Sequence, residues 1–118
     1  MNEAQKAQLT AAGIDVEDAM ERFMHNEGLM LKFLLRFSED QSMSQLRLAM
    51  EHQDADGAFE AAHTLKGVAG NLSMTGLFHQ TGILVEHLRN RDLAAAADEM
   101  PALEEQYARV TAALAALG

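Results

Sequence analysis

The amino-acid sequence predicts an all-α protein, an antiparallel four-helix bundle with an additional short N-terminal helix. Apolar residues recur at the three- and four-residue spacing of an amphipathic helix along most of the chain. The 118 residues include one proline and eight scattered glycines, so helix breakers are few. Four long helical segments with short connections favour antiparallel packing of neighbours. We expect residues 1–118 to form a single domain with one hydrophobic core.

The first half of the chain predicts two helices that follow a frayed or partly ordered arm at residues 1–13. Asp15 is placed to cap a short helix from residue 16 to about residue 25, because its carboxylate can accept hydrogen bonds from the free N–H groups of the first turn. Asn26 can cap the second helix in the same way. This second helix is long and amphipathic, is loosened around residues 38–44, and ends at residues 52–54.

The second half of the chain predicts two more long helices and a divided C-terminal segment. Asp54 caps the third helix, whose apolar stripe consists of Ala58, Ala61, Ala62, Leu65, Val68, Ala69 and Leu72. A turn near residues 73–76 leads to the fourth helix, which ends at residues 90–92. The residues of this helix that we expect to face the core are Leu77, Phe78, Thr81, Leu84, Val85 and Leu88. Pro101 lacks the backbone N–H that a helix interior needs, so we expect a short helix before it and a longer one after it.

Residues 62–71, with the sequence AHTLKGVAGN, gather polar residues and glycines on one side of the third helix. Each residue turns about 100° around the helix axis; with His63 as zero, Gly67 falls at about +40°, Gly70 at about −20° and Lys66 at about −60°. Each glycine costs roughly 1 kcal/mol relative to alanine inside a helix. We interpret the glycines as open space beside an imidazole that faces water and is approached by something bulky. The plainer alternatives are an ordinary histidine and a tight contact between helices.

Two further residues of this helix lie near His63. Phe59 falls at about −40°, outside the apolar stripe, and is either a docking anchor for a partner or packed against the neighbouring helix. Asn71 falls at about +80° and is expected to form hydrogen bonds locally or at the rim of the site. Neither position is expected to take part in chemistry directly.

The run from His63 to Asn71 resembles the signature of histidine-containing phosphotransfer (HPt) domains. Residues 13–17, the long helix before the histidine and residues 84–88 are similar to that family in order and spacing, so the resemblance spans most of the chain. The sequence departs from the family pattern at Ser73 and Met74, where a small Gly-Ala pair is frequent. This departure concerns the turn after the third helix and leaves the run around the histidine intact.

The resemblance implies an intermediate of a phosphorelay. In that function His63 accepts a phosphoryl group from the phospho-aspartate of a response-regulator receiver domain and passes it to the aspartate of another receiver. Lys66 stabilises the phosphoryl oxygens, and partner docking involves Gly67, Gly70, Phe59 and Asn71. The implied partners are receiver domains and a hybrid sensor histidine kinase. We expect Mg²⁺ to come from the receiver, no cofactor or metal on this chain, and a monomer that leaves the histidine face free.

Other functions fit the sequence less well. A carboxylate metal centre uses two Glu-x-x-His motifs, and Glu60 with His63 forms one such pair without a second. The dimerisation domain of a sensor histidine kinase places an acidic residue directly after its histidine, whereas Thr64 stands here. No glycine-rich nucleotide loop is present, so we expect a phosphotransfer protein without ATP-dependent kinase activity. A helical bundle that binds a partner without chemistry remains the alternative.

Composition excludes several classes of protein. The net charge of −9 has the wrong sign for neutralising a phosphate backbone, so we expect no binding of nucleic acid. The absence of cysteine excludes disulfides and thiolate metal sites. Lys32 and Arg36 interrupt the apolar stretch at residues 29–37, and the N-terminal residues lack the pattern of a secretory signal. We therefore expect a cytoplasmic protein without membrane attachment.

Overall fold

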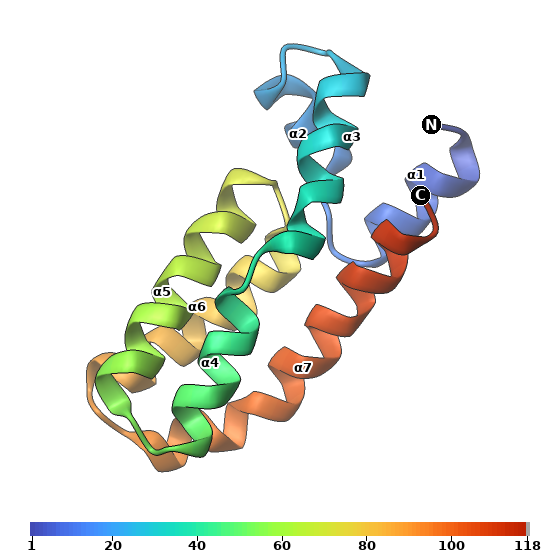
Figure 1. Cartoon of the computed structure of the whole chain (residues 1–118). Coiled ribbons are helices and arrows are strands. Elements are labelled where there is room, and N and C mark those ends of the chain that lie inside the picture. The colour runs from blue at the N-terminus through green and yellow to red at the C-terminus, as the bar shows by residue number, and fades with distance from the viewer. Residues whose placement is uncertain (118) are drawn as a thin grey trace.

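Helices make up the fold of residues 1–117, the residues that this computed structural model describes (Figure 1). No strand occurs among them, which confirms the all-α prediction. The elements in chain order are α1 (Glu3–Ala11), α2 (Val16–Arg22), α3 (Glu27–Leu35), the 3₁₀ helix η1 (Arg36–Glu39), α4 (Ser42–Glu51), α5 (Ala55–Asn71), α6 (Thr75–Arg89) and α7 (Leu93–Ala115).

Helices α4, α5, α6 and α7 form the main body, and each packs against the next along the chain. The chain direction alternates from one helix to the next, so these neighbours are antiparallel (Figure 1). Arg47 of α4 forms an ion pair of 2.6 Å with Glu104 of α7, and the rings of Phe37 and Tyr107 lie 5.7 Å apart between centroids. Side chains from the region of η1 and α4 therefore reach α7 across the bundle.

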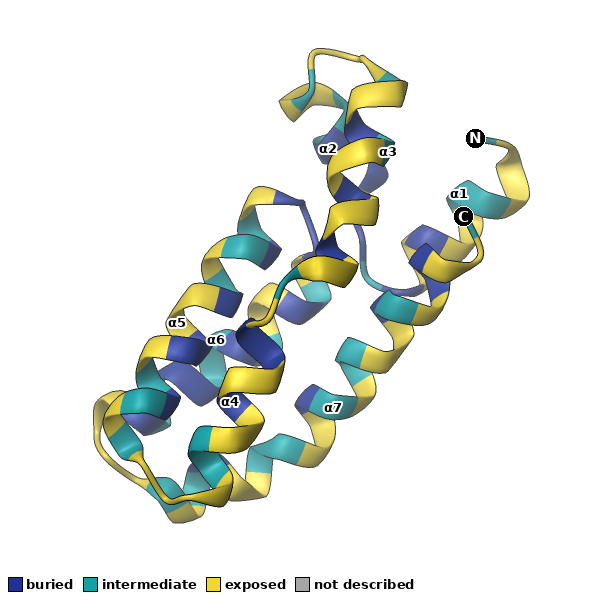
Figure 2. Cartoon of the chain, viewed as in Figure 1, coloured by how far each residue is buried: buried dark blue, intermediate teal, exposed yellow. Residues whose placement is uncertain are grey.

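The apolar stripe predicted for α5 is the face that turns into the core (Figure 2). Val68 is partly buried and packs against the core, while the other stripe residues are buried: Ala58, Ala61, Ala62, Leu65, Ala69 and Leu72. Leucine and methionine side chains from the surrounding helices, such as Leu46 and Leu84, are fully buried in the same core. Burial of this stripe leaves the opposite face of α5 in solvent.

The predicted caps are confirmed at three helix starts. The side chains of Asp15, Asn26 and Asp54 each accept a hydrogen bond of 3.0 Å from a backbone N–H in the first turn of α2, α3 and α5. Helix α2 ends at Arg22 rather than near residue 25. It ends early because Met24 and His25 have left-handed backbones, with φ of 55° and 60°, which reverse the chain into α3.

The expected long second helix is divided into α3, η1 and α4. Asp40 has an extended backbone after η1, and its carboxylate accepts hydrogen bonds from the N–H and hydroxyl of Ser42 at 3.0 and 3.1 Å. The loosened region predicted at residues 38–44 is therefore a break in the helix. The turn before α6 is also shorter than expected, since α6 begins at Thr75.

The two helices expected around Pro101 are a single helix, α7, whose ribbon is continuous through this position (Figure 1). Proline removes the hydrogen bond to the carbonyl of residue i−4, here Ala97. Ala97 and Pro101 both lie on the exposed side of α7, where water can satisfy the freed carbonyl. Ala96 and Leu103, on either side of the proline, are buried and hold both halves of the helix against the core.

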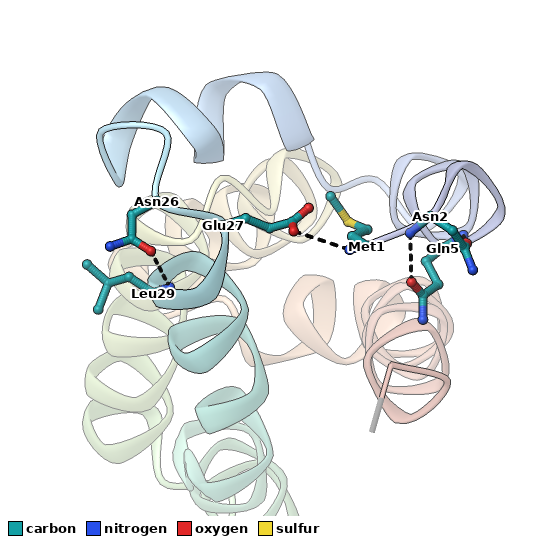
Figure 3. A network of polar contacts seen from close by, with 6 residues as sticks. All are labelled: Met1, Asn2, Gln5, Asn26, Glu27 and Leu29. Carbon is teal, nitrogen blue, oxygen red and sulfur yellow. Dashed lines mark hydrogen bonds and ion pairs between the residues drawn. The ribbon is translucent and has the colours of Figure 1, made fainter.

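Residues 1–13 differ from the frayed arm that we expected, because most of them form α1, which packs against α7. Leu9 is fully buried there, and Asn2 and Gln5 exchange side-chain and backbone hydrogen bonds at the start of the helix. The amino group of Met1 lies 3.2 Å from the carboxylate of Glu27 at the start of α3 (Figure 3). Local polarity suggested an arm, whereas tertiary burial of Leu9 stabilises a helix.

The segment between α1 and α2 holds the turn between α5 and α6. The carbonyl of Gly13 accepts hydrogen bonds from the N–H of Gly76 and the hydroxyl of Thr75, each at 3.1 Å. Gly13 has φ of +86°, a backbone that side chains disfavour. The Ser73 hydroxyl donates to the Asp18 carboxylate at 2.6 Å, and the Ser73 carbonyl accepts from the backbone N–H of Asp15. The end of α5 is therefore tied to the N-terminal part of the chain.

The hydrogen bond between Ser73 and Asp18 makes the free energy of unfolding depend on pH in the acid range. Donation by the Ser73 hydroxyl, followed by the ion pair with Arg22, lowers the pKa of Asp18 below its usual value of 3.8. A carboxyl whose pKa is lower in the folded state stabilises the fold above its unfolded pKa, and this stability is lost as the pH falls through the folded pKa. Between about pH 5 and pH 2, we expect the free energy of unfolding to fall more steeply for the unaltered protein than for Asp18→Asn.

Denaturant unfolding at several pH values measures this difference. Asp98→Asn is the matched control, because Asp98 is exposed and has no ion pair or side-chain hydrogen bond among residues 1–117. Parallel pH profiles for the unaltered protein and Asp18→Asn would contradict the assignment.

Candidate functional site

His63 projects from the exposed face of α5, as the helical spacing predicted. Its neighbours one turn further along differ in exposure: Lys66 is partly buried and Gly67 is exposed. No side-chain or backbone group among residues 1–117 forms a hydrogen bond with the imidazole ring. The ring nitrogens therefore have no protein hydrogen-bond partner within these residues, and the side chain is exposed to solvent.

The ring of Phe59 lies against the ring of His63. Their centroids are 5.8 Å apart with an angle of 25° between the planes, a stacked arrangement. Phe59 is itself partly buried against the core, and the guanidinium of Arg89 at the end of α6 lies 5.2 Å from its centroid. Of the two interpretations of Phe59, the structure favours packing against the neighbouring helix. Its role in docking a partner stays a prediction.

Lys66 leans from α5 toward α6. Its ammonium lies 5.3 Å from the centroid of the Phe78 ring, a cation–π contact. A Cβ atom added at Gly82 would lie 3.6 Å from the Cε and 3.9 Å from the Nζ of Lys66, so the lysine stem passes over the bare backbone of that glycine. No acidic group of residues 1–117 forms an ion pair with the lysine. Its charge is not neutralised by a neighbouring carboxylate.

The two glycines beside His63 have different surroundings. A Cβ atom at Gly67 would have no atom within 4 Å, which is the open space that the sequence predicted. A Cβ atom at Gly70 would lie only 3.1 and 3.2 Å from ring carbons of Phe78. The open space that we expected at both glycines is therefore found at Gly67, while at Gly70 a side chain of α6 lies next to the bare backbone, and the role of Gly70 in docking stays a prediction.

Asn71 is the last residue of α5 and is exposed. Together with Gly67 and Gly70 it lines a surface depression of about 400 Å³, whose other walls include Arg22 and Phe78. The depression thus brings together three of the four residues predicted to dock a partner. It does not include Phe59, which lies toward the start of α5.

Three residues of α6 at this site were not identified from the sequence. Phe78 was assigned to the core, but 42 % of it is exposed. Gly82 and Arg89 were not singled out, although the missing side chain of Gly82 leaves space for Lys66, and Arg89 lies over the ring of Phe59. The one signal in the sequence was Gly82 itself, because a glycine in the interior of a helix lowers stability unless a neighbouring side chain occupies the space that it leaves. Its position opposite Lys66 depends on how α6 packs against α5.

Two further properties concern residues 1–117 as a whole. No group of three or more histidine, aspartate or glutamate side chains in this range is arranged to hold a metal ion. None of the helices in the same range has both the length and the apolar content that crossing a membrane requires.

The fold and site define a class of protein, an antiparallel helical bundle that presents an accessible histidine with a lysine one turn away. The family model of the Hpt domain matches residues 30–113, and the chain belongs to this family. Membership implies histidine phosphotransfer in a phosphorelay, with receiver domains as partners. Comparison with curated proteins and with solved structures finds no match. The matched range contains α4, α5, α6, most of α7 and the residues of α5 and α6 at the site, and it excludes α1 and α2.

The surroundings of the two glycines predict different effects on stability. We expect Gly67→Ala to raise the free energy of unfolding by up to about 1 kcal/mol, because alanine favours a helix and the space is open. Gly70→Ala should raise the free energy of unfolding by less, because the Phe78 ring must move by a few tenths of an ångström to make room for the methyl group. Chemical denaturation measures both, with Gly28→Ala in α3 as a control. Equal stabilisation by the two substitutions would contradict this account.

Proposed function

We propose that His63 is the residue that carries the phosphoryl group in this Hpt domain. It accepts the group from the phospho-aspartate of one receiver domain and passes it to the aspartate of another. The observation that supports this most directly is the exposed imidazole, which forms no hydrogen bond within residues 1–117, on a helix that carries the unpaired lysine Lys66 one turn further along. The other histidines, His25, His52, His79 and His87, have no lysine one turn away on the same helix.

The chemistry requires a nitrogen nucleophile and little else from this chain. A neutral imidazole nitrogen, Nε2 by resemblance to the family, attacks the phosphorus of the aspartyl phosphate in line with the leaving carboxylate oxygen. The N–P bond forms as the P–O bond to aspartate breaks, and the carboxylate of the receiver is released. The same step in reverse, on a different receiver, returns the histidine to its free state.

Lys66 supplies positive charge for the transferring group. Cβ atoms one turn apart on a helix are roughly 5–6 Å apart, so an ammonium at this position can reach oxygens on a phosphoryl group carried by His63. Charge that develops on these oxygens is stabilised by a cation already in place. The rest of the electrostatic apparatus, including Mg²⁺, belongs to the receiver in this proposal. No cofactor is assigned to this chain.

Gly67 gives the receiver access. A side chain there would stand beside the imidazole, in the space through which the aspartyl phosphate must enter, and the structure leaves that space empty. We assign the exposed surface around Gly67 and Asn71 as the docking face. The partners in this proposal are the receiver of a hybrid sensor histidine kinase and that of a response regulator. The protein acts as a cytoplasmic monomer, which keeps this face free.

The role of His63 predicts the outcome of a labelling experiment. We expect His63→Gln to fold normally, since the side chain is exposed, and to take no label from a phosphorylated receiver. His79→Gln, an exposed histidine of α6, should be labelled like the unaltered chain. Transfer is followed by loss of ³²P from the receiver and its appearance on this chain, and folding by circular dichroism. Undiminished labelling of His63→Gln would reject the assignment.

The role of Lys66 predicts a loss of rate without a matching loss of binding. We expect Lys66→Ala to slow transfer about tenfold or more at saturating receiver, because a cation that stabilises developing charge is removed. The receiver concentration at half-maximal rate should change much less. Lys6→Ala in α1 is the control for loss of one positive charge. If rate and binding fell by the same factor, Lys66 would be a docking residue instead.

A further inference from the structure

Phe78 occupies an unusual place for a large apolar side chain. It lies on α6 beside buried Leu77, yet 42 % of it is exposed at the edge of the α5–α6 contact. Its ring enters the gap over Gly70, where any side chain on α5 would come within 3.1 Å of it. Because Gly70 has no side chain, the ring of Phe78 from α6 can pack against the backbone of α5 at this position.

The same ring lies next to the ammonium of Lys66. The Nζ atom is 5.3 Å from the ring centroid, and the stem of the lysine crosses the bare backbone at Gly82. Two glycines on two different helices thus leave space for one aromatic ring and one lysine stem. A long side chain confined in this way loses less conformational freedom when it later contacts an anion.

An aromatic ring holds a lysine without neutralising it. A carboxylate in this position would pair with the ammonium and compete with phosphoryl oxygens for its N–H donors. A ring face attracts the cation through its quadrupole but carries no net charge. Although the chain carries a net charge of −9, no carboxylate of residues 1–117 forms an ion pair with Lys66.

We propose that Phe78 is a positioning residue for Lys66: its ring, which fills the space over Gly70, holds the ammonium without a competing carboxylate, at a place from which it can reach a phosphoryl group on His63. This role rests on the function proposed above. The ring does not touch the reacting atoms in this account, and it acts on the rate of transfer only through Lys66.

A double-mutant cycle tests the coupling. We expect Phe78→Leu to slow phosphoryl transfer from a phosphorylated receiver about three- to fivefold at saturating receiver, with the half-saturating concentration unchanged. Phe78→Tyr, which keeps a ring, should restore most of the rate. In the Lys66→Ala background, Phe78→Leu should have no further effect. An unchanged or faster rate for Phe78→Leu, or an equal loss in both backgrounds, would overturn the proposal.

Tyr107→Leu is the matched control. It removes the ring of another cation–π pair, formed with Arg47, that involves neither α5 nor α6. Its transfer rate should equal that of the unaltered protein once both are confirmed to be folded. If Tyr107→Leu slowed transfer as much as Phe78→Leu does, removal of any aromatic ring from a cation–π pair would affect the rate through the stability of the fold. That result would overturn the specific role of Phe78.

A measurement without any receiver separates this inference from the proposed function. The ring current of Phe78 should shift the Hε resonances of Lys66 upfield in ¹H–¹³C spectra, and the shift should vanish in Phe78→Leu and persist in Phe78→Tyr. Failure of the unaltered chain to take label would reject the proposed function whatever this shift is. Normal labelling without the shift would reject only the positioning role.

Discussion

Burial of one apolar stripe of α5 between α4 and α6 sets the direction of every side chain at the site. Alanines and leucines of this stripe lie in the core, so the helix cannot rotate about its axis without exposing them. His63 and Gly67 are on the opposite face and are held in solvent by the same packing. An exposed histidine on a rigid helix suits the proposed transfer, in which the partner brings most of the catalytic groups.

Near His63, aromatic rings of α5 and α6 lie next to two cationic side chains. Lys66 lies over Phe78, and Arg89 lies over Phe59, whose ring also stacks on His63. Arg89 also forms an ion pair of 3.3 Å with Glu86, whereas Lys66 forms no ion pair among residues 1–117. Rings anchor side chains while leaving their charge available, which is a useful property where the ligand is a phosphoryl group.

The N-terminal part of the chain, although outside the range that matches the family, supports the end of α5. Backbone and side-chain hydrogen bonds from Gly13, Asp15 and Asp18 fix the turn at Ser73, which connects the helix that bears His63 to the helix that bears Phe78. The amide of Gln106 on α7 donates to the carbonyl of Ala12 and adds a third element to this junction. The relative placement of α5 and α6 is thus stabilised from one end of the bundle.

Local sequence determined the helical class, the caps at Asp15, Asn26 and Asp54, and the outward direction of His63. These features depend on periodicity and on hydrogen bonds within a few residues, which the chain order contains directly. Tertiary structure decided that Pro101 lies inside one helix, that α1 is ordered, and that Phe78 fills the gap at Gly70. Each of these depends on which distant residues pack together, because burial against another helix outweighs the local preference.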